Sequence, residues 1–256
     1  MAPDSPPAAL SLRGLRKNFG ATIAVDGLDL DIPAGSFYGI VGPNGAGKTT
    51  TLSMATGLLT PDSGTVLVHG VDLWRDPDRA KPTLGVLPDG LRTFDRLTGA
   101  ELISYAGLLR GMAPAMVEER RDDLLAALDL DAVGRTLVTD YSAGMTKKIA
   151  LACALVHAPR VLVLDEPFEA VDPVSAKAIR RILQDFAATG GTVVMSSHVM
   201  ALVERVCDRV AIVGHGRVLA HGTLEEVSGG GDLEERFVGL IGDTSERRDL
   251  TWLRQS

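Results

Sequence analysis

The sequence predicts an α/β fold with two additions, an antiparallel β region near the N-terminus and a block of helices inserted in the middle. Two continuous apolar runs indicate the core, "VLVLDEP" from Val161 and "TVVMSSH" from Thr192, with the amphipathic stretch "VSAKAIRRILQDFAA" between them. Strands buried on both faces of a parallel sheet have such runs, and helices connect them. Alternating apolar residues before the core predict the β region, and helical periodicity predicts the insertion.

The N-terminal elements follow from alternation and from turn residues. Residues 9–40 include "ATIAVDGLDLDIPAG", which predicts antiparallel strands leading into a buried strand at "SFYGIVG". The stretch "SGTVLVHGVDL" repeats the alternating pattern after the first helix. We therefore expect an N-terminal antiparallel β subdomain beside the core.

The middle of the chain has the pattern of helices. "LTGAELISYAGLLRGM" opens with Thr98 and Glu101 at the spacing of a capping box, and "APAMVEERRDDLLAALDL" continues with helical period. We expect this inserted α-helical subdomain to span about residues 90–158. After the last buried strand, "RVAIVGHGRVLAHGT" predicts a hairpin that turns at Gly214 and Gly216.

Both ends of the chain are expected to lie outside the main domain. The prolines in "MAPDSPPAAL" predict a short disordered lead over residues 1–8, with no pattern of a secretion signal. One domain is expected over residues 9–227, with the helical subdomain inserted in it. The polar residues 228–256 predict a C-terminal tail with a small peripheral helix and a frayed end.

Composition narrows the possible functions. The 256 residues are 45% hydrophobic, with 33 Asp and Glu against 26 Lys and Arg for a net charge of −7. A chain of this size can build a large core, which excludes general disorder. The acidic excess argues against nucleic acid as the main partner, because basic surfaces bind phosphate backbones. The longest nearly apolar stretch, Ile149–Ala158, is well short of the about 20 residues that a membrane span needs.

One glycine-rich segment indicates a nucleotide site. Residues 42–50, "GPNGAGKTT", match G-x-x-x-x-G-K-[ST], the Walker A pattern, between a predicted strand and a predicted helix. Glycines let backbone N–H groups close around phosphates, Lys48 neutralises phosphate charge, and the Thr49 hydroxyl can bind Mg²⁺. The ATP-binding residues expected here are Gly42, Pro43, Asn44, Gly45, Ala46, Gly47, Lys48, Thr49 and Thr50. This loop identifies the predicted core as that of a P-loop NTPase.

Acidic residues and a histidine follow two of the predicted core strands. Asp165 ends a strand, where a carboxylate can hold Mg²⁺ through water, and Glu166 is then suited to orient or deprotonate the attacking water. His198 ends a later strand at the same sheet edge, where ligands gather in open α/β folds. Structural roles are the alternative, because an acidic pair can cap the turn before Pro167 and a lone histidine is more often structural.

A second helix start offers further anion-binding groups. Ser142 in "YSAGM" is a predicted N-cap, and Gly144 lies in the first turn, so backbone N–H groups are free there. An ordinary capped helix is the alternative, but it leaves unexplained both the glycine and the position of this segment 23 residues before Asp165.

The order of these motifs resembles the nucleotide-binding subunits of ABC transporters. The shared order is Walker A loop, helical insertion, Ser-x-Gly helix start, Asp-Glu pair and strand-end histidine, over about Leu10 to Thr223. In that family two such domains pair head to tail, and the signature helix of one contacts the γ-phosphate held by the other. The resemblance therefore assigns Ser142, Ala143 and Gly144 to the ATP of a partner subunit.

The resemblance also assigns roles to single residues. It implies that Phe19 stacks on adenine, that Asp165 binds Mg²⁺ and that Glu166 is the general base. It further implies that His198 contacts the γ-phosphate. Asp172 in "EAVDP" matches the D-loop, which contacts the other subunit across the dimer.

Three motifs depart from the family pattern, at four positions. The signature usually reads LSGGQ, whereas here one glycine is Ala143 and the glutamine is Met145. The Q-loop glutamine, which contacts the Mg²⁺ and water network and the membrane subunit, is replaced by Asp89, so a metal contact is expected but the coupling role is open. The D-loop begins with Glu169 in place of a small hydroxyl residue.

The resemblance implies an ATPase that uses ATP and Mg²⁺ and drives transport through a separate integral membrane permease subunit. "LPDGLRTFDRLTGAEL" and "YSAGM" look most like bacterial exporter subunits. The expected partners are the permease and a second ATPase subunit, as a homodimer, with no nucleic acid, and the expected location is cytoplasmic, peripheral at the inner face of the cell membrane. Two alternatives remain, a soluble ABC ATPase unrelated to transport and an ATP-binding module with little hydrolysis.

Overall fold

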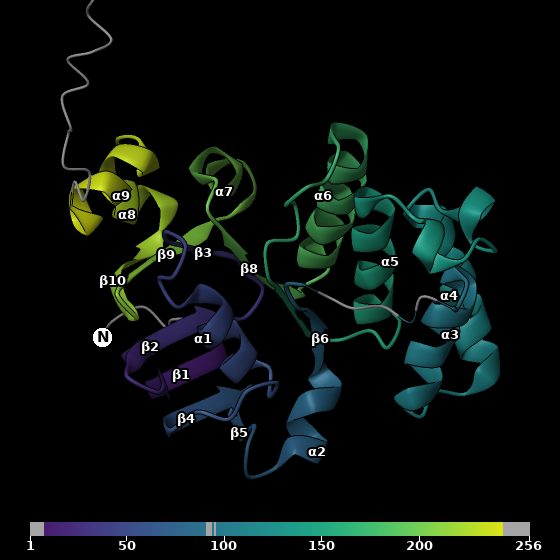
Figure 1. The fold of residues 1–256 in the computed structure, drawn as a ribbon, viewed down its shortest axis with the longest axis horizontal. Coiled ribbons are helices and arrows are strands. Elements are labelled where there is room, and N and C mark those ends of the chain that lie inside the picture. The colour runs from purple at the N-terminus through teal and green to yellow at the C-terminus, as the bar shows by residue number, and fades with distance from the viewer. Residues whose placement is uncertain (1–7, 91–93, 95, 243–256) are drawn as a thin grey trace, which may run out of the picture.

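The computed structural model describes residues 8–90, 94 and 96–242, which form two sheets and the helices that pack on them (Figure 1). The strands are β1 (Ala8–Phe19), β2 (Thr22–Pro33), β3 (Phe37–Val41), β4 (Ser63–Val68), β5 (Val71–Asp72), β6 (Leu84–Leu87), β7 (Val161–Leu164), β8 (Thr192–Ser197), β9 (Arg209–Gly214) and β10 (Arg217–Thr223).

The α-helices are α1 (Lys48–Ala55), α2 (Pro77–Ala80), α3 (Gly99–Leu109), α4 (Pro114–Ala127), α5 (Ala143–Leu155), α6 (Pro173–Ala188), α7 (Met200–Val206), α8 (Leu224–Ser228) and α9 (Leu233–Ile241). Short 3₁₀ helices are η1 (Lys81–Thr83), η2 (Asp131–Val133) and η3 (Val138–Asp140).

The central sheet has six strands in the order β10-β9-β3-β8-β7-β6. The five strands from β9 to β6 run parallel, and β10 pairs antiparallel with β9 in the predicted terminal hairpin. Every residue of β3, β7 and β8 is buried, as their continuous apolar runs predict. Their carboxyl ends meet at one edge, so the segments after β3, β7 and β8 lie close together.

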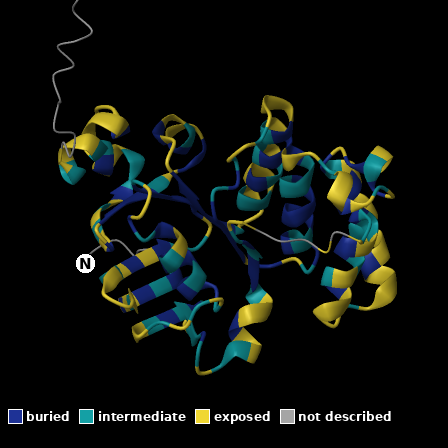
Figure 2. Cartoon of the chain, in the orientation of Figure 1, coloured by how far each residue is buried: buried dark blue, intermediate teal, exposed yellow. Residues whose placement is uncertain are grey.

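Side chains of the central sheet alternate between two cores. Phe37 and Val41 of β3 pack in one core with the helices α3 to α7, whereas Tyr38 and Ile40 pack in the other with the antiparallel sheet and α1. The same alternation along the neighbouring strands divides the two cores cleanly. Figure 2 shows these strands as buried while the outward faces of the helices are exposed.

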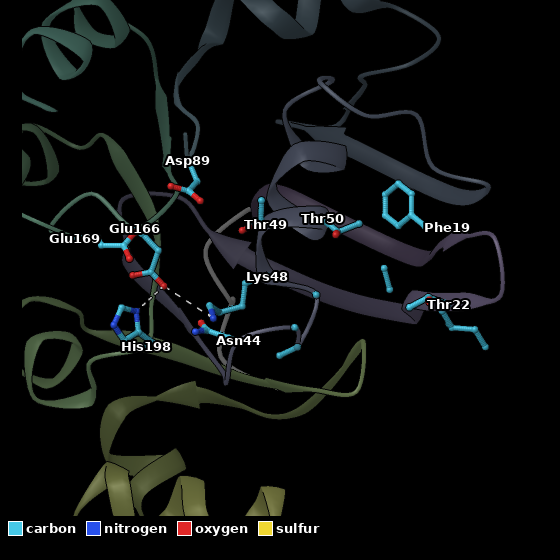
Figure 3. Close-up of a pocket in the computed structure, with 15 residues that line it drawn as sticks. Phe19, Thr22, Asn44, Lys48, Thr49, Thr50, Asp89, Glu166, Glu169 and His198 are labelled. Carbon is cyan, nitrogen blue, oxygen red and sulfur yellow. Dashed lines mark ion pairs between the residues drawn. The ribbon is translucent and has the colours of Figure 1, made fainter. Parts of the chain in front are cut away.

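The antiparallel sheet has the order β2-β1-β4-β5. It fills the N-terminal region as predicted, and β1 pairs along its length with β2, so that Phe19 lies opposite Thr22 at the turn. This turn reaches the same side of the molecule as the Walker A loop (Figure 3). The α/β fold with an antiparallel β subdomain and an inserted helical subdomain is thereby confirmed.

The inserted helices α3, α4 and α5 occupy the middle of the chain and stand apart from the antiparallel sheet (Figure 1). Thr98 and Glu101 form the predicted capping box at the start of α3. Ser142 is the N-cap of α5, and its Oγ accepts a hydrogen bond from Met145 N–H at 3.2 Å. Both caps therefore form as the sequence predicts.

The structure describes only part of the predicted lead and of the predicted C-terminal tail. Ala8, assigned to the lead, begins β1, whereas residues 1–7 lie outside the described residues, as do 91–93, 95 and 243–256. In the predicted tail, Leu233 of α9 is fully buried in the core beside α7. Its N–H donates to Glu204 Oε1 at 2.9 Å, which ties this helix to the domain. Among the described residues, no helix is long and apolar enough to cross a membrane.

Candidate active site

The Walker A loop joins β3 to α1, and its glycines lie where a larger residue does not fit. A Cβ on Gly42 would lie 2.3 Å from the carbonyl oxygen of Val213, and one on Gly47 would lie 2.4 Å from that of Ala24. Gly47 also has a φ of +100°, which favours glycine. The loop is therefore held between β9 and β2, with its backbone close to both.

Lys48 is buried at the start of α1. Its Nζ donates hydrogen bonds to the carbonyl oxygens of Gly42 at 2.8 Å and Pro43 at 3.2 Å, so the side chain spans the loop. Thr49 is exposed beside it, and Thr50 is half-buried. Helix α1 has no acidic residue in its first turn, which leaves its positive dipole end to attract a phosphate.

A cavity of about 500 Å³ opens beside this loop (Figure 3). Its size and its mixed lining suit a nucleotide. It brings together segments that are distant in the sequence, the β1–β2 turn, the Walker A loop and the ends of the core strands. The lining residues are Phe19, Thr22, Ile23, Ala24, Asn44, Gly45, Ala46, Gly47, Lys48, Thr49, Thr50, Asp89, Glu166, Glu169 and His198.

The half of the cavity nearest the core strands is charged. Oε1 of Glu166 lies 3.1 Å from Nδ1 of His198 and 4.0 Å from Nζ of Lys48 (Figure 3). Glu166 has a φ of +45°, an uncommon conformation for a residue with a side chain. A carboxylate fixed beside the phosphate loop is placed to take a proton from a water.

Asp165 is buried and is not one of the residues that line this cavity. It is 3% exposed, and its Oδ1 accepts a hydrogen bond of 2.5 Å from the Ser196 hydroxyl. The same Ser196 Oγ accepts a hydrogen bond of 2.9 Å from the N–H of Glu166. Ser196 therefore fixes both the carboxylate of Asp165 and the peptide that presents Glu166.

The oxygen donors near the loop suit Mg²⁺. Thr49 supplies a hydroxyl and Asp165 a carboxylate, both hard oxygen ligands of the kind that Mg²⁺ takes. Among the described residues, no group of three or more His, Cys, Asp and Glu could hold a metal. The chain would thus supply one or two ligands and leave the remainder to phosphates and water, as is usual for Mg²⁺.

Asp89 and Glu169 face the nucleotide cavity and also a second cavity next to it. This second cavity, of about 390 Å³, lies between the segment after β6 and helix α5, and Ala143 and Lys147 also line it. Asp89 therefore lines the same cavity as the Walker A loop, and its contact with a metal or its water shell stays a prediction. The structure gives Glu169 a place in the site, which the sequence had left without a role.

The predicted signature residues lie outside the nucleotide cavity of their own chain. Ser142 and Ala143 are exposed, and a Cβ on Gly144 would lie 2.7 Å from both Asp172 Oδ2 and Ser175 Oγ. Asp172 is the N-cap of α6. Hydrogen bonds from Ser175 hold the pKa of Asp172 below its usual value. The helix start that could bind an anion therefore does not line the cavity that contains Lys48 of the same chain.

Phe19 lines the cavity on the side opposite Glu166 (Figure 3). Phe19 is 52% exposed, and the Lys17 Nζ lies 5.9 Å from the centroid of its ring. An exposed aromatic face beside a phosphate loop is suited to stack on a base. The arrangement agrees with the role that the resemblance implies for Phe19.

The site combines a Walker A loop, a strand-end acidic pair and a strand-end histidine. A comparison with known protein families agrees with this geometry. The family of ABC transporters matches residues 25–169. The chain belongs to the ABC transporter family. It is an ATP-binding subunit that hydrolyses ATP.

Relatives of this ABC ATPase include subunits named for resistance and export. It is 38% identical over 222 residues to the daunorubicin/doxorubicin resistance ATP-binding protein DrrA of Streptomyces peucetius, covering 87% of this chain and 67% of DrrA. It is 32% identical over 253 residues to the linearmycin resistance ATP-binding protein LnrL of Bacillus subtilis, covering 94% of this chain and 81% of LnrL. A solved ATP-binding subunit of an ABC transporter is 28% identical, with a TM-score of 0.85 over 91% of this chain and 100% of that chain.

Two contacts of this ABC ATPase site were not expected from the sequence. Ser196 precedes the predicted His198 by two residues on a buried strand, and a buried hydroxyl there is a weak signal that a polar partner lies on the next strand. Lys147 of α5 donates a hydrogen bond of 2.9 Å to the carbonyl oxygen of Glu166. No sequence signal predicts this contact, because it joins two segments through the tertiary fold.

Proposed function

We propose that this subunit powers export through a separate membrane permease, as a homodimer that closes around two ATP molecules and opens after hydrolysis. The observation that carries the proposal is the division of the site within one chain. Lys48, Glu166 and His198 surround one cavity, whereas the exposed start of α5 at Ser142 lies elsewhere. A second copy placed head to tail would bring its Ser142 to this cavity.

The relatives support export as the direction of transport. One is named for daunorubicin/doxorubicin resistance, and the Nod factor export ATP-binding protein I of Cupriavidus metallidurans is 35% identical over 224 residues, covering 86% of this chain and 73% of that protein. ABC ATP-binding subunits work with membrane permease components, so the proposed location is peripheral at the inner face of the cell membrane.

An apolar surface supports a protein partner. Tyr105, Leu108 and Leu109 are exposed on one face of α3, at the three- and four-residue spacing that groups side chains on a helix. Phe94 packs edge-on against Tyr105 with 5.3 Å between ring centroids, and it is 57% exposed. Exposed apolar groups gathered on one surface favour contact with another protein.

In the proposed reaction Glu166 takes a proton from the water that attacks the γ-phosphate, and His198 steadies the Glu166 carboxylate and contacts the phosphate. Lys48 and the N–H groups of residues 42–50 hold the phosphates. Mg²⁺, held by Thr49 and Asp165, with Asp89 as a further candidate, would neutralise developing phosphate charge when bound. Phe19 stacks on adenine.

Glu166→Gln tests the proposal. The amide keeps the shape of the side chain but cannot accept the proton, so we expect ATP binding to persist while turnover falls by about 10²-fold or more. The trapped ATP should also convert the variant to a dimer, measured by size-exclusion chromatography with light scattering. Turnover close to that of the wild type would remove Glu166 from the role of base, and a monomer with bound ATP would contradict the dimer.

A pull-down of the tagged subunit from detergent-solubilised membranes tests the transporter assignment. A stoichiometric polytopic partner, identified by mass spectrometry, is expected. Recovery of ribosomal or DNA-associated proteins from the soluble fraction would instead favour an ABC ATPase that is not linked to transport.

A further inference from the structure

We propose that Lys147 is a positioning residue that ties the signature helix α5 to the catalytic base of the same chain. The proposal rests on the proposed role of Glu166 as the base, and it rests on the proposed dimer only for its consequence, which is communication between two ATP sites. The contact itself is intramolecular. Lys147 Nζ donates a hydrogen bond of 2.9 Å to the carbonyl oxygen of Glu166, 19 residues along the chain.

The Glu166 peptide is held from two sides. Its N–H donates to Ser196 Oγ at 2.9 Å, which fixes it to β8. Its carbonyl oxygen accepts from Lys147 and also from the N–H of Glu169 at 3.2 Å. Since φ at Glu166 is +45°, these bonds stabilise a backbone conformation that a residue with a side chain seldom adopts. This conformation directs the carboxylate towards His198 and Lys48.

Lys147 and the signature residues Ala143 and Gly144 belong to one helix, α5. Lys147 follows Gly144 by three residues, so both lie on the same face of α5. Gly144 packs against the start of α6 at Asp172 and Ser175, and Lys147 reaches the loop that leads into that helix. One face of α5 therefore lies along the segment from Glu166 to Ser175.

The surroundings of Lys147 strengthen this interpretation. It lines the second cavity together with Asp89 and Glu169, the two acidic departures from the family pattern. No ion pair within 4.0 Å joins Lys147 to either carboxylate among the described residues, so its ammonium group bonds the carbonyl while two negative groups face the same space. Charge attraction favours the ammonium in this cavity. A hydrogen bond from a charged donor is also stronger than one from a neutral donor.

Communication between the two ATP sites would follow from the head-to-tail arrangement. In the proposed dimer, Ser142–Gly144 of one subunit bind the nucleotide held by the other subunit's Walker A loop. Lys147, one turn farther along the same helix, fixes the base of its own subunit's site. Displacement of α5 by nucleotide at one site would therefore shift the base at the other, which is a physical route for coupling between the sites.

The test compares Lys147→Met with Lys147→Arg and with Lys177→Met. Methionine removes the donor at similar length, arginine retains a charged donor, and Lys177 is an exposed lysine on α6 with no hydrogen bond or ion pair among the described contacts. Loss of a charged hydrogen bond that orients the base is expected to lower kcat about 10-fold with KM changed less than about 2-fold. Lys147→Arg should recover most of the rate, and Lys177→Met should match the wild type.

Three outcomes overturn the positioning role. The first is a Lys147→Met kcat within about 2-fold of the wild type. The second is a loss of ATP affinity and melting temperature that parallels the loss of kcat, which indicates a general structural role. The third is an arginine variant as slow as the methionine variant, because the donor would then not matter.

Cooperativity tests the consequence separately. Wild-type turnover is expected to have a Hill coefficient for ATP above 1, and Lys147→Met is expected to bring it close to 1. A wild type without cooperativity, or a variant that keeps the wild-type value, overturns the coupling. A monomeric Glu166→Gln with bound ATP would refute the proposed dimer, and the kcat comparison would still decide whether Lys147 positions the base.

Discussion

Ser196→Ala should destabilise the protein far more than the same substitution at Ser197, its neighbour on β8. Ser196 is fully buried, and its Oγ makes two hydrogen bonds, to the Asp165 carboxylate at 2.5 Å and from the Glu166 N–H at 2.9 Å. Ser197 is 2% exposed, and its Oγ accepts a single bond of 3.0 Å from the N–H of Val199. The two substitutions remove the same atom from adjacent buried positions.

The expected magnitudes follow from the groups left without partners. Ser196→Ala removes one hydrogen bond to a charged group, worth about 1.5–3 kcal/mol, and one to a neutral N–H, worth about 1 kcal/mol. The sum is about 3 kcal/mol of unfolding free energy. Ser197→Ala removes only the neutral bond, at about 1 kcal/mol. Asp165 cannot recover the loss from bulk water because it is 3% exposed.

Thermal unfolding without nucleotide measures the difference, since bound ligand would add its own stabilisation. For a domain of this size, 1 kcal/mol corresponds to about 2–4 °C. Ser196→Ala should therefore lower Tm by about 6–12 °C, and Ser197→Ala by about 2–4 °C. Equal shifts for the two variants would refute the reasoning, because the buried charge would then not depend on the Ser196 hydroxyl.

Three further predictions concern other parts of the molecule. Phe19→Ala should raise KM for ATP about 5-fold through lost base stacking, while Phe19→Tyr and inhibition by tripolyphosphate should be unchanged; a matching loss for tripolyphosphate would contradict stacking. Gly216→Ala should weaken ATP binding, because the new Cβ would lie 2.8 Å from the Ala24 carbonyl oxygen at a φ of +72°. Gly229, with a φ of +65° and no atom within 4 Å of a built Cβ, is the control. Equal weakening in Gly229→Ala would exclude the close approach to Ala24 as the cause. Burial lowers the pKa of His157 from 6.5 to about 4. As the pH falls, the imidazole is therefore protonated in the unfolded chain before it is protonated in the folded one, so the free energy of unfolding decreases between about pH 6.5 and about pH 4. His157→Gln should reduce the drop in Tm between pH 7 and pH 5. An unchanged drop would refute this role of His157 in the pH dependence of stability.

Local patterns predicted much of this fold and site. The Walker A loop, the capping box at Thr98 and Glu101 and the N-cap at Ser142 each depend on a few consecutive residues, whose backbone preferences act within one turn. The apolar run of β7 and the apolar residues 193–195 of β8 predicted buried parallel strands, because strands covered on both faces lack the alternation of a half-exposed strand.

Contacts between distant segments could not be predicted in this way. The burial of Asp165 depends on Ser196, 31 residues away, and the support of Glu166 depends on Lys147 on another helix. The Gly216 N–H donates to the Ala46 carbonyl oxygen at 3.0 Å, which links the terminal hairpin to the Walker A loop. No periodicity or spacing encodes such pairs, because packing of the completed sheets brings them together.

The charges at the starts of helices α1 and α5 are compatible with a shared site. Helices α3, α8 and α9 carry glutamate in their first turns, which satisfies the positive end of each dipole within the chain. Helices α1, α4, α5, α6 and α7 carry no acidic residue there, and two of these, α1 and α5, begin at the Walker A and signature segments. Helix α1 opens towards the nucleotide cavity, but α5 begins at the exposed Ser142, away from it. A phosphate bound between α1 of one subunit and α5 of another would interact favourably with the positive ends of both helix dipoles. The proposed dimer should then be stable only with nucleotide, and it should weaken as added salt screens the charges at its rim.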